Sequence, residues 1–314
     1  MTSVIFLGTP NFGSVVLEGL VKDSYDVKAV VTQPDKKVGR KQVVHASEVK
    51  QMAQKYDLPV YQPAKLSGSK ELDELMEIKP DFIVTAAYGQ FLPSKFLASA
   101  KIAPVNVHGS LLPKYRGGAP IQYSLLNGDS ETGITIMEMV KKMDAGDIFA
   151  QKALKIEPED NSGTLFEKLS ILGRDLLLET LPKFLNNTVT RTSQDPDQVV
   201  FSPNISKKQE QIKLTMTASQ ANNLIRALNP DPGAYLMLEG KRFKAWKARV
   251  ADEKTDLPAG SLVSNKKRFA ISFADNSVLD LLEVQPMGKK RMDIKSYVNG
   301  QGSHFKVGEK IIDD

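Results

Sequence analysis

The sequence has no cysteine, only three histidines and no long hydrophobic run. Without cysteine the chain can form no disulfide, no thiolate nucleophile and no Cys-based zinc site. No stretch reaches the ~20 apolar residues that a membrane span needs, and the first residues lack the basic region of a signal peptide. We therefore expect a cytoplasmic protein with no membrane partner. The 314 residues, 25% of them charged, are enough for two globular domains.

A dinucleotide-binding motif is also missing from the N-terminal part. An apolar strand pattern at Val4–Gly8 is followed by a helical pattern at Ser14–Val21, which favours an α/β fold. Thr9 and Pro10 stand where the G-x-G-x-x-G motif would continue. Further strand patterns at 27–32 and 82–87, alternating with helical patterns, predict a doubly wound parallel sheet. Patterns at 133–140 and 148–154, joined by a turn, predict added antiparallel strands.

Two polar segments interrupt these patterns. Residues 33–42 are basic and show no periodicity, so we expect an exposed loop. Residues 188–208 are polar and contain Pro196 and Pro203, which is typical of a linker. We therefore place the boundary between two domains at residues 203 and 204, giving domains 1–203 and 204–314.

The second domain carries the excess positive charge. Residues 208–314 hold 18 lysines and arginines against 13 aspartates and glutamates, whereas the rest of the chain is balanced at 24 of each. Short strand patterns separated by turn residues, from Ala234 to Val284, predict a small β-barrel. A basic domain beside a neutral one suggests a polyanionic partner, although a lysine-rich surface alone would have the same charge.

The segment from Asn106 to Gly118 is the strongest candidate for a functional site. We expect a strand at Val105–His108, because Pro104 interrupts the apolar run before it. Asn106 and His108 are two residues apart, so on a strand they share a face. A glycine-rich loop and a helix start at Pro120 follow. The pair could be a turn amide and a core histidine, or an amide and an imidazole at an α/β active site.

These motifs resemble the folate-dependent formyltransferase family. The resemblance is carried by Gly8-Thr9-Pro10, by Asn106-Val107-His108-Gly109-Ser110-Leu111-Leu112-Pro113, and by Asp144-Ala145-Gly146-Asp147. It covers nearly the whole chain. Within the family, the loop Thr32-Gln33-Pro34-Asp35 with Gly39-Arg40, and the basic C-terminal domain, are similar to members that formylate methionyl initiator tRNA.

The resemblance implies a fold, a reaction and a set of residues. The fold would be a Rossmann-like formyltransferase domain followed by an OB-like basic barrel. The reaction would move a formyl group from 10-formyltetrahydrofolate to the α-amino group of methionine on initiator tRNA, for translation initiation, by a monomer and without a metal. Catalysis would use Asn106, His108 and Asp144, with Asn106 and His108 donating to an oxyanion and Asp144 orienting His108. The folate would contact Tyr88, Gly89, Gln90, Leu92, Ser110, Leu111, Leu112 and Pro113. The tRNA would contact Arg40, Lys41, Lys266, Lys267 and Arg268.

Two alternatives stay open on the sequence alone. A related enzyme could use another acceptor: a glycinamide ribonucleotide or amino-sugar formyltransferase, or a formyltetrahydrofolate hydrolase. A protein of another class could bind RNA on an inactive α/β scaffold, although the intact Asn106, His108 and Asp144 argue against that possibility.

Overall fold

The computed structural model describes residues 1–38, 42–266 and 268–313. They form two compact units: residues 1–120, 131–155 and 166–203, and residues 121–130, 156–165 and 204–314. Arg40, Lys41 and Lys267, which the resemblance assigns to tRNA, lie outside the described residues. Within the described parts of the chain, no helix combines the length and apolar composition that a membrane crossing needs.

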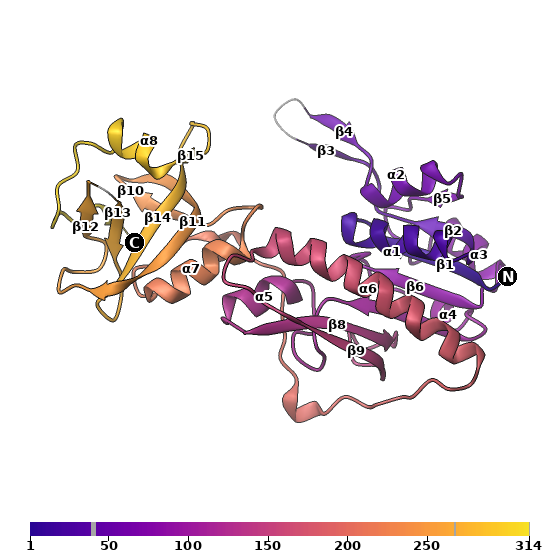
Figure 1. The fold of residues 1–314 in the computed structure, drawn as a ribbon. Helices are drawn as coiled ribbons and strands as arrows, with labels where there is room; N and C mark the ends of the chain where they lie inside the picture. Colours follow the sequence, from indigo (N-terminus) through magenta and orange to yellow (C-terminus); the bar gives the residue numbers. More distant parts are fainter. Residues whose placement is uncertain (39–41, 267, 314) are drawn as a thin grey trace. The chain divides into compact units, whose positions relative to one another are not determined.

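The first unit is built on one twisted sheet with the strand order β5-β2-β1-β6-β7-β8-β9 (Figure 1). The pairs among β5, β2, β1, β6 and β7 are parallel, and β8 and β9 are antiparallel additions, as the sequence predicted. The strands are β1 (Ser3–Gly8), β2 (Asp26–Val31), β5 (Val60–Tyr61), β6 (Phe82–Ala86), β7 (Ala103–His108), β8 (Glu131–Glu138) and β9 (Ile148–Lys155).

Helices connect these strands and bury both faces of the sheet. Those of the first unit are α1 (Asn11–Lys22), α2 (Glu48–Lys55), α3 (Lys70–Glu77), α4 (Ser94–Leu97) and, from Phe166 onward, α6 (Ser162–Leu185), whereas α5 (Pro120–Leu126) belongs almost entirely to the second unit. Ile5 and Leu7 of β1 pack with Leu72 of α3 and Phe96 of α4. On α6, Gly173 lies against Val107 of β7, so the helix approaches this part of the sheet closely. The doubly wound α/β fold is confirmed.

The topology brings several strand ends together. Chain order runs from β1 outward through β2 to β5, then returns to β6 on the other side of β1. In open α/β sheets, ligand sites lie at such a reversal, outside the carboxyl ends of the strands. The carboxyl ends of β1, β6 and β7 therefore put Gly8, Ala86 and His108 at one edge of the sheet.

Three local expectations were wrong. Residues 33–42 are not all loop, because β3 (Lys36–Val38) and β4 (Val43–His45) pair as an antiparallel hairpin. Strand β7 begins before Pro104, whose carbonyl oxygen still accepts a hydrogen bond from the Met139 amide. The expected linker contains the short helical turns η1 (Pro196–Gln198) and η2 (Lys207–Glu210), and its first part is bonded to the first unit.

The second unit contains a curled antiparallel sheet with the order β12-β13-β14-β11-β10-β16 and with β15 beside β14. Residues 308–312 bond to Gly260 and Leu262, so the C-terminal segment joins the β12 side of the sheet to β10. This half-barrel confirms the predicted fold class. The elements are α7 (Ala218–Ala227), β10 (Tyr235–Leu238), β11 (Lys241–Lys254), β12 (Leu262–Asn265), β13 (Phe269–Ser272), β14 (Ser277–Pro286), β15 (Met292–Asp293), α8 (Ile294–Asn299) and β16 (Ile312–Asp313).

Candidate active site

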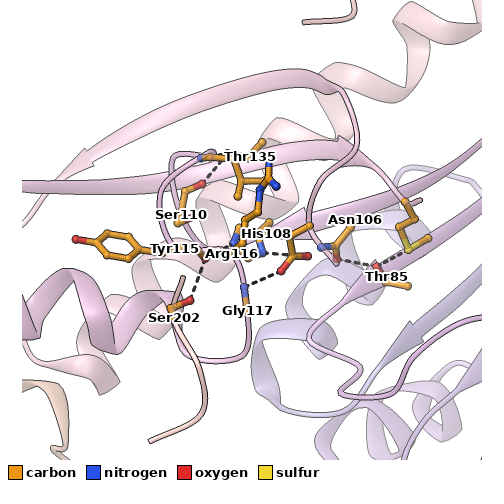
Figure 2. Close-up of polar contacts among 12 residues, drawn as sticks. Thr85, Asn106, His108, Ser110, Tyr115, Arg116, Gly117, Thr135 and Ser202 are labelled. Atoms are coloured by element: carbon orange, nitrogen blue, oxygen red, sulfur yellow. Dashed lines mark hydrogen bonds and ion pairs between the residues drawn. The ribbon is translucent and has the colours of Figure 1, made fainter. Parts of the chain in front are cut away.

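Asn106 lies on β7 beside Thr85 of the neighbouring strand β6. The Thr85 hydroxyl donates to Asn106 Oδ1 at 2.7 Å. This bond fixes the orientation of the amide, so Nδ2 points away from Thr85, toward the His108 side (Figure 2). Asn106 therefore presents a hydrogen-bond donor at the edge where the strands end.

His108 is buried at the end of β7, with 5% of its surface exposed. Its Nε2 lies 3.0 Å from the Tyr115 carbonyl oxygen, and its Nδ1 lies 3.8 Å from Asp144 Oδ1. A carbonyl oxygen only accepts, so Nε2 must carry the hydrogen of that bond. In the neutral ring Nδ1 is then the acceptor, and it is the nitrogen that faces the carboxylate.

Asp144 lies in the turn between β8 and β9, with a left-handed φ of +48°. Its Oδ2 accepts a hydrogen bond of 2.9 Å from the Gly117 amide, which leaves Oδ1 directed at His108. Gly117 has φ +129°, and a Cβ there would lie 2.7 Å from the Ser202 carbonyl oxygen. Glycine is therefore required at the position that holds this carboxylate.

The Tyr115 carbonyl oxygen accepts two hydrogen bonds, one from His108 Nε2 and one from the Ser202 hydroxyl. Tyr115 has a left-handed φ of +65°, and the buried Ser202 hydroxyl donates to its carbonyl oxygen at 3.0 Å (Figure 2). Such a backbone conformation costs about 1–3 kcal/mol in a non-glycine residue and persists only where its surroundings hold it. Ser202 and His108 supply that restraint together.

The loop from Ser110 to Pro113 is anchored to β8 and β9. The buried Thr135 hydroxyl donates to the Ser110 carbonyl oxygen at 2.6 Å and accepts from the Leu112 amide at 3.1 Å. Gln151 Nε2 donates to the Leu112 carbonyl oxygen at 2.8 Å and to the Thr135 hydroxyl at 2.9 Å. The Thr135 hydroxyl thus uses its donor and one acceptor position on the loop, and its other acceptor position on Gln151 of β9.

The loop from Tyr88 to Leu92 follows β6, and most of its predicted ligand side chains are engaged elsewhere. Tyr88 and Leu92 pack into the core beside α3 and α4, and burial raises the pKa of Tyr88 to about 12. Gln90 bonds the Leu66 amide and the Ala64 carbonyl oxygen. The side chains of Tyr88, Gln90 and Leu92 are therefore used within the protein and do not face a ligand at this edge as the resemblance implied.

The basic residues of the second unit differ in how much of their charge is offset. Arg268 is paired with Glu253 and lies 3.4 Å from Asp280, whose side chain is only 1% exposed. Arg249 contacts the same Asp280 at 2.9 Å. Lys266 is exposed beside the β12–β13 turn. The predicted tRNA contact at Arg268 therefore involves a guanidinium already shared with two carboxylates.

Several residues that build the site had no sequence signal. Thr85, Tyr115, Gln194 and Ser202 hold the predicted residues through bonds that join positions 7 to 87 residues apart. Gln194 and Ser202 lie in the segment that the composition assigned to a linker. The structure places Asp144 Oδ1 3.8 Å from His108 Nδ1, with Asn106 two residues before His108 on β7, so the three residues that the resemblance assigns to catalysis lie at the same edge.

Two family profiles and several full-length relatives match the chain. The formyl transferase family profile matches residues 1–181, and the profile of the formyl transferase C-terminal domain matches residues 204–302. A methionyl-tRNA formyltransferase of Lactobacillus gasseri is 80% identical over all of both chains, and that of Lactobacillus delbrueckii subsp. bulgaricus is 67% identical over the same extent.

A solved structure shows the same fold at much lower identity. The N-formyltransferase from Helicobacter canadensis, in complex with folinic acid and dTDP-3-aminofucose, matches with a TM-score of 0.70 at 21% identity, over 91% of this chain and all of that one. The fold, the family profiles and the full-length relatives agree, and the chain belongs to the formyltransferase family.

Proposed function

We propose that the protein transfers the formyl group of 10-formyltetrahydrofolate to the α-amino group of methionine on initiator tRNA. The observation that carries the proposal is the convergence of Asn106, His108 and Asp144 at the carboxyl edge of β7. The full-length relatives named methionyl-tRNA formyltransferase support the choice of acceptor. In the reaction the methionine nitrogen bonds to the formyl carbon, the bond from that carbon to folate N10 breaks, and one proton passes from the attacking nitrogen to N10.

Asn106 would stabilise the oxygen of the formyl group as it gains negative charge. Its Nδ2 is directed away from Thr85 and is therefore oriented before a substrate arrives. A fixed donor of this kind costs no reorganisation during the reaction, and removing one typically costs about 3–4 kcal/mol of transition-state stabilisation.

His108 would take the proton from the attacking amine. Because Nε2 donates to Tyr115, the nitrogen open for chemistry is Nδ1, and this favours proton transfer over a second donation to the oxyanion. Asp144 would stabilise the imidazolium across the 3.8 Å that separate its Oδ1 from Nδ1. A water molecule could complete the path to the leaving nitrogen.

The formyl donor would bind along the loop from Ser110 to Pro113, opposite the loop from Tyr88 to Leu92. The first of these loops is held rigidly by Thr135 and Gln151, which suits a pocket that positions a large co-substrate. Solved relatives of this fold contain folate derivatives, including folinic acid and tetrahydrofolic acid. Backbone groups and the Asn106 amide are a donor set that fits the formyl oxygen.

The tRNA would be bound by the basic second domain and selected by the segment near Arg40. We propose the domain limits 1–203 and 204–314, supported by a C-terminal family match that begins at residue 204. A monomer acting in the cytoplasm, where translation begins, completes the proposal. In the family that the chain resembles, the loop after the second strand enters the acceptor stem, where initiator tRNA lacks a strong first base pair. Opening such an end is cheaper than opening a paired one, so Arg40→Ala should remove the preference for initiator over elongator tRNA.

One assay tests the proposal against its alternatives. Purified protein is given 10-formyltetrahydrofolate and, in separate reactions, charged initiator tRNA, charged elongator tRNA, an amino sugar nucleotide and water alone. Formylation confined to charged initiator tRNA supports the proposal. Hydrolysis without an acceptor, or transfer to the sugar nucleotide, would replace it with one of the related activities. His108→Ala, which should lose turnover while still binding tRNA, separates catalysis from RNA binding.

A further inference from the structure

The polar residues 190–203, which we call the return segment, follow α6 and are bonded to two loops of the active site. Thr192 exchanges backbone hydrogen bonds of 2.8 and 2.9 Å with Ile148, next to the Asp144 turn. At the other end, Ser202 exchanges backbone bonds with Arg116 and Ala119. The segment lies between the two family matches, which end at 181 and begin at 204.

Gln194 is the side chain through which the return segment contacts both loops at once. Its Nε2 donates to the carbonyl oxygens of Asp144 and Gly146, at 2.9 and 2.8 Å. Its Oε1 accepts from Nε and Nη2 of the buried Arg116, at 3.0 and 2.8 Å. Carbonyls only accept and a guanidinium only donates, so no other orientation of the amide satisfies these four contacts.

These contacts determine where the Asp144 carboxylate lies. Asp144 is held in a left-handed conformation at the tip of a turn, and its Oδ2 receives the Gly117 amide from the loop that contains Arg116. Gln194 joins the backbone of that turn to the side chain of that loop. Gln194 thus adds a second restraint to the Gly117 bond in aligning Asp144 Oδ1 with His108 Nδ1 across 3.8 Å.

We propose that Gln194 is a positioning residue for catalysis, which acts by holding the Asp144 turn and the Arg116 loop in the arrangement that His108 requires. This inference rests on the proposed function for its kinetic readout. A displacement of about 1 Å in a catalytic group can cost about 100-fold in rate. We therefore expect Gln194→Ala to lower kcat by roughly 10- to 100-fold, with KM for either substrate within about twofold of the original.

Gln194→Glu separates the contact with Arg116 from the contact with the Asp144 turn. The carboxylate keeps an acceptor for Arg116, but it cannot donate to the carbonyls of Asp144 and Gly146. If Gln194 acts through the Asp144 turn, Gln194→Glu should lose kcat as Gln194→Ala does. Wild-type kcat in Gln194→Glu would show that the residue only accommodates Arg116, and would overturn the proposal.

Gln198 supplies a matched control in the same segment. It is exposed, and its amide bonds Asp195 within its own turn at 2.8 Å. Gln198→Ala and Gln198→Glu should keep the original kcat and KM. An equal loss of kcat in these variants would assign the effect to the segment as a whole and would overturn a specific role for Gln194.

A second measurement does not depend on the reaction. The chain has only His45, His108 and His304, so the ring signals of His108 can be identified by NMR from their absence in His108→Gln. They should shift in both Gln194 variants and stay unchanged in both Gln198 variants. Unmoved His108 signals in Gln194→Ala would refute the positioning role. If the wild-type protein fails to formylate initiator tRNA, the proposed function fails, and this NMR comparison still decides the role of Gln194.

Discussion

Thr135→Val should destabilise the protein far more than its change in size suggests. Valine has nearly the shape of threonine, so the substitution opens no cavity, and Thr135 is fully buried on β8. It removes the hydroxyl that donates to the Ser110 carbonyl oxygen and accepts from the Leu112 amide and from Gln151. Gln151 keeps its bond to the Leu112 carbonyl oxygen, but the other two backbone groups lose this partner.

The magnitude follows from the two orphaned groups. A buried polar group left without a partner costs about 1–3 kcal/mol, so for two groups we expect a loss of about 2–6 kcal/mol in the free energy of unfolding. This is a large part of the ~5–15 kcal/mol that stabilises a typical domain. Thr135→Ser keeps the hydroxyl and loses one methyl group, and it should cost only about 1 kcal/mol.

Urea denaturation of the wild type and both variants measures this difference, and amide hydrogen exchange at Leu112 locates it. The exchange of the Leu112 amide should be faster in Thr135→Val, because this amide loses its acceptor. If Thr135→Val and Thr135→Ser unfold at the same urea concentration, the hydroxyl network does not hold the loop, and the reasoning is refuted.

Three further outcomes are expected. Asn106→Ala should lower kcat about 10²- to 10³-fold, with unchanged tRNA affinity measured by filter binding; turnover near that of the wild type would remove the amide from the mechanism. Lys266→Ala should weaken initiator and elongator tRNA alike and flatten the salt dependence of binding; an effect on one tRNA only would contradict a phosphate contact. The hydrogen bond from Lys55, and then that from Tyr56, lowers the pKa of Glu18 from 4.5 to about 2. The contribution of the ionised Glu18 to stability is therefore complete above pH 4.5 and lost as the pH falls toward 2. Glu18→Gln should make the urea midpoint vary less with pH across that range.

Local sequence patterns predicted most helices and strands, but they did not predict the contacts between residues far apart in the chain. The spacing of Asn106 and His108 on a strand, and the turn at Asp144, were readable because each depends on a few neighbouring residues. The partners that fix them were not, because Gln194 and Ser202 are polar residues in a segment without hydrophobic periodicity. A polar composition of this kind occurs both in solvated linkers and in segments bonded to a site, so it does not distinguish them.

The hairpin of β3 and β4 was missed for a related reason. Its strands are three residues long, and the exposed Val43 and Val44 give no alternation between a buried and an exposed face. At Pro104 the sequence predicted too short a strand, because a residue without an amide hydrogen is unfavourable inside a strand. In β7 its carbonyl oxygen is used by Met139 instead.

The return segment also has a consequence for the order in which the active site is assembled during folding. The bonds from Gln194 to Arg116 and from Ser202 to Tyr115 close loops of 78 and 87 residues. Contacts so distant in sequence form late, because the entropy of closing the loop is lost before the contact compensates it. During synthesis the strand bearing His108 leaves the ribosome well before residue 202. The sheet can therefore form while the His108 ring lacks its full restraint, and activity should recover after the sheet itself during refolding.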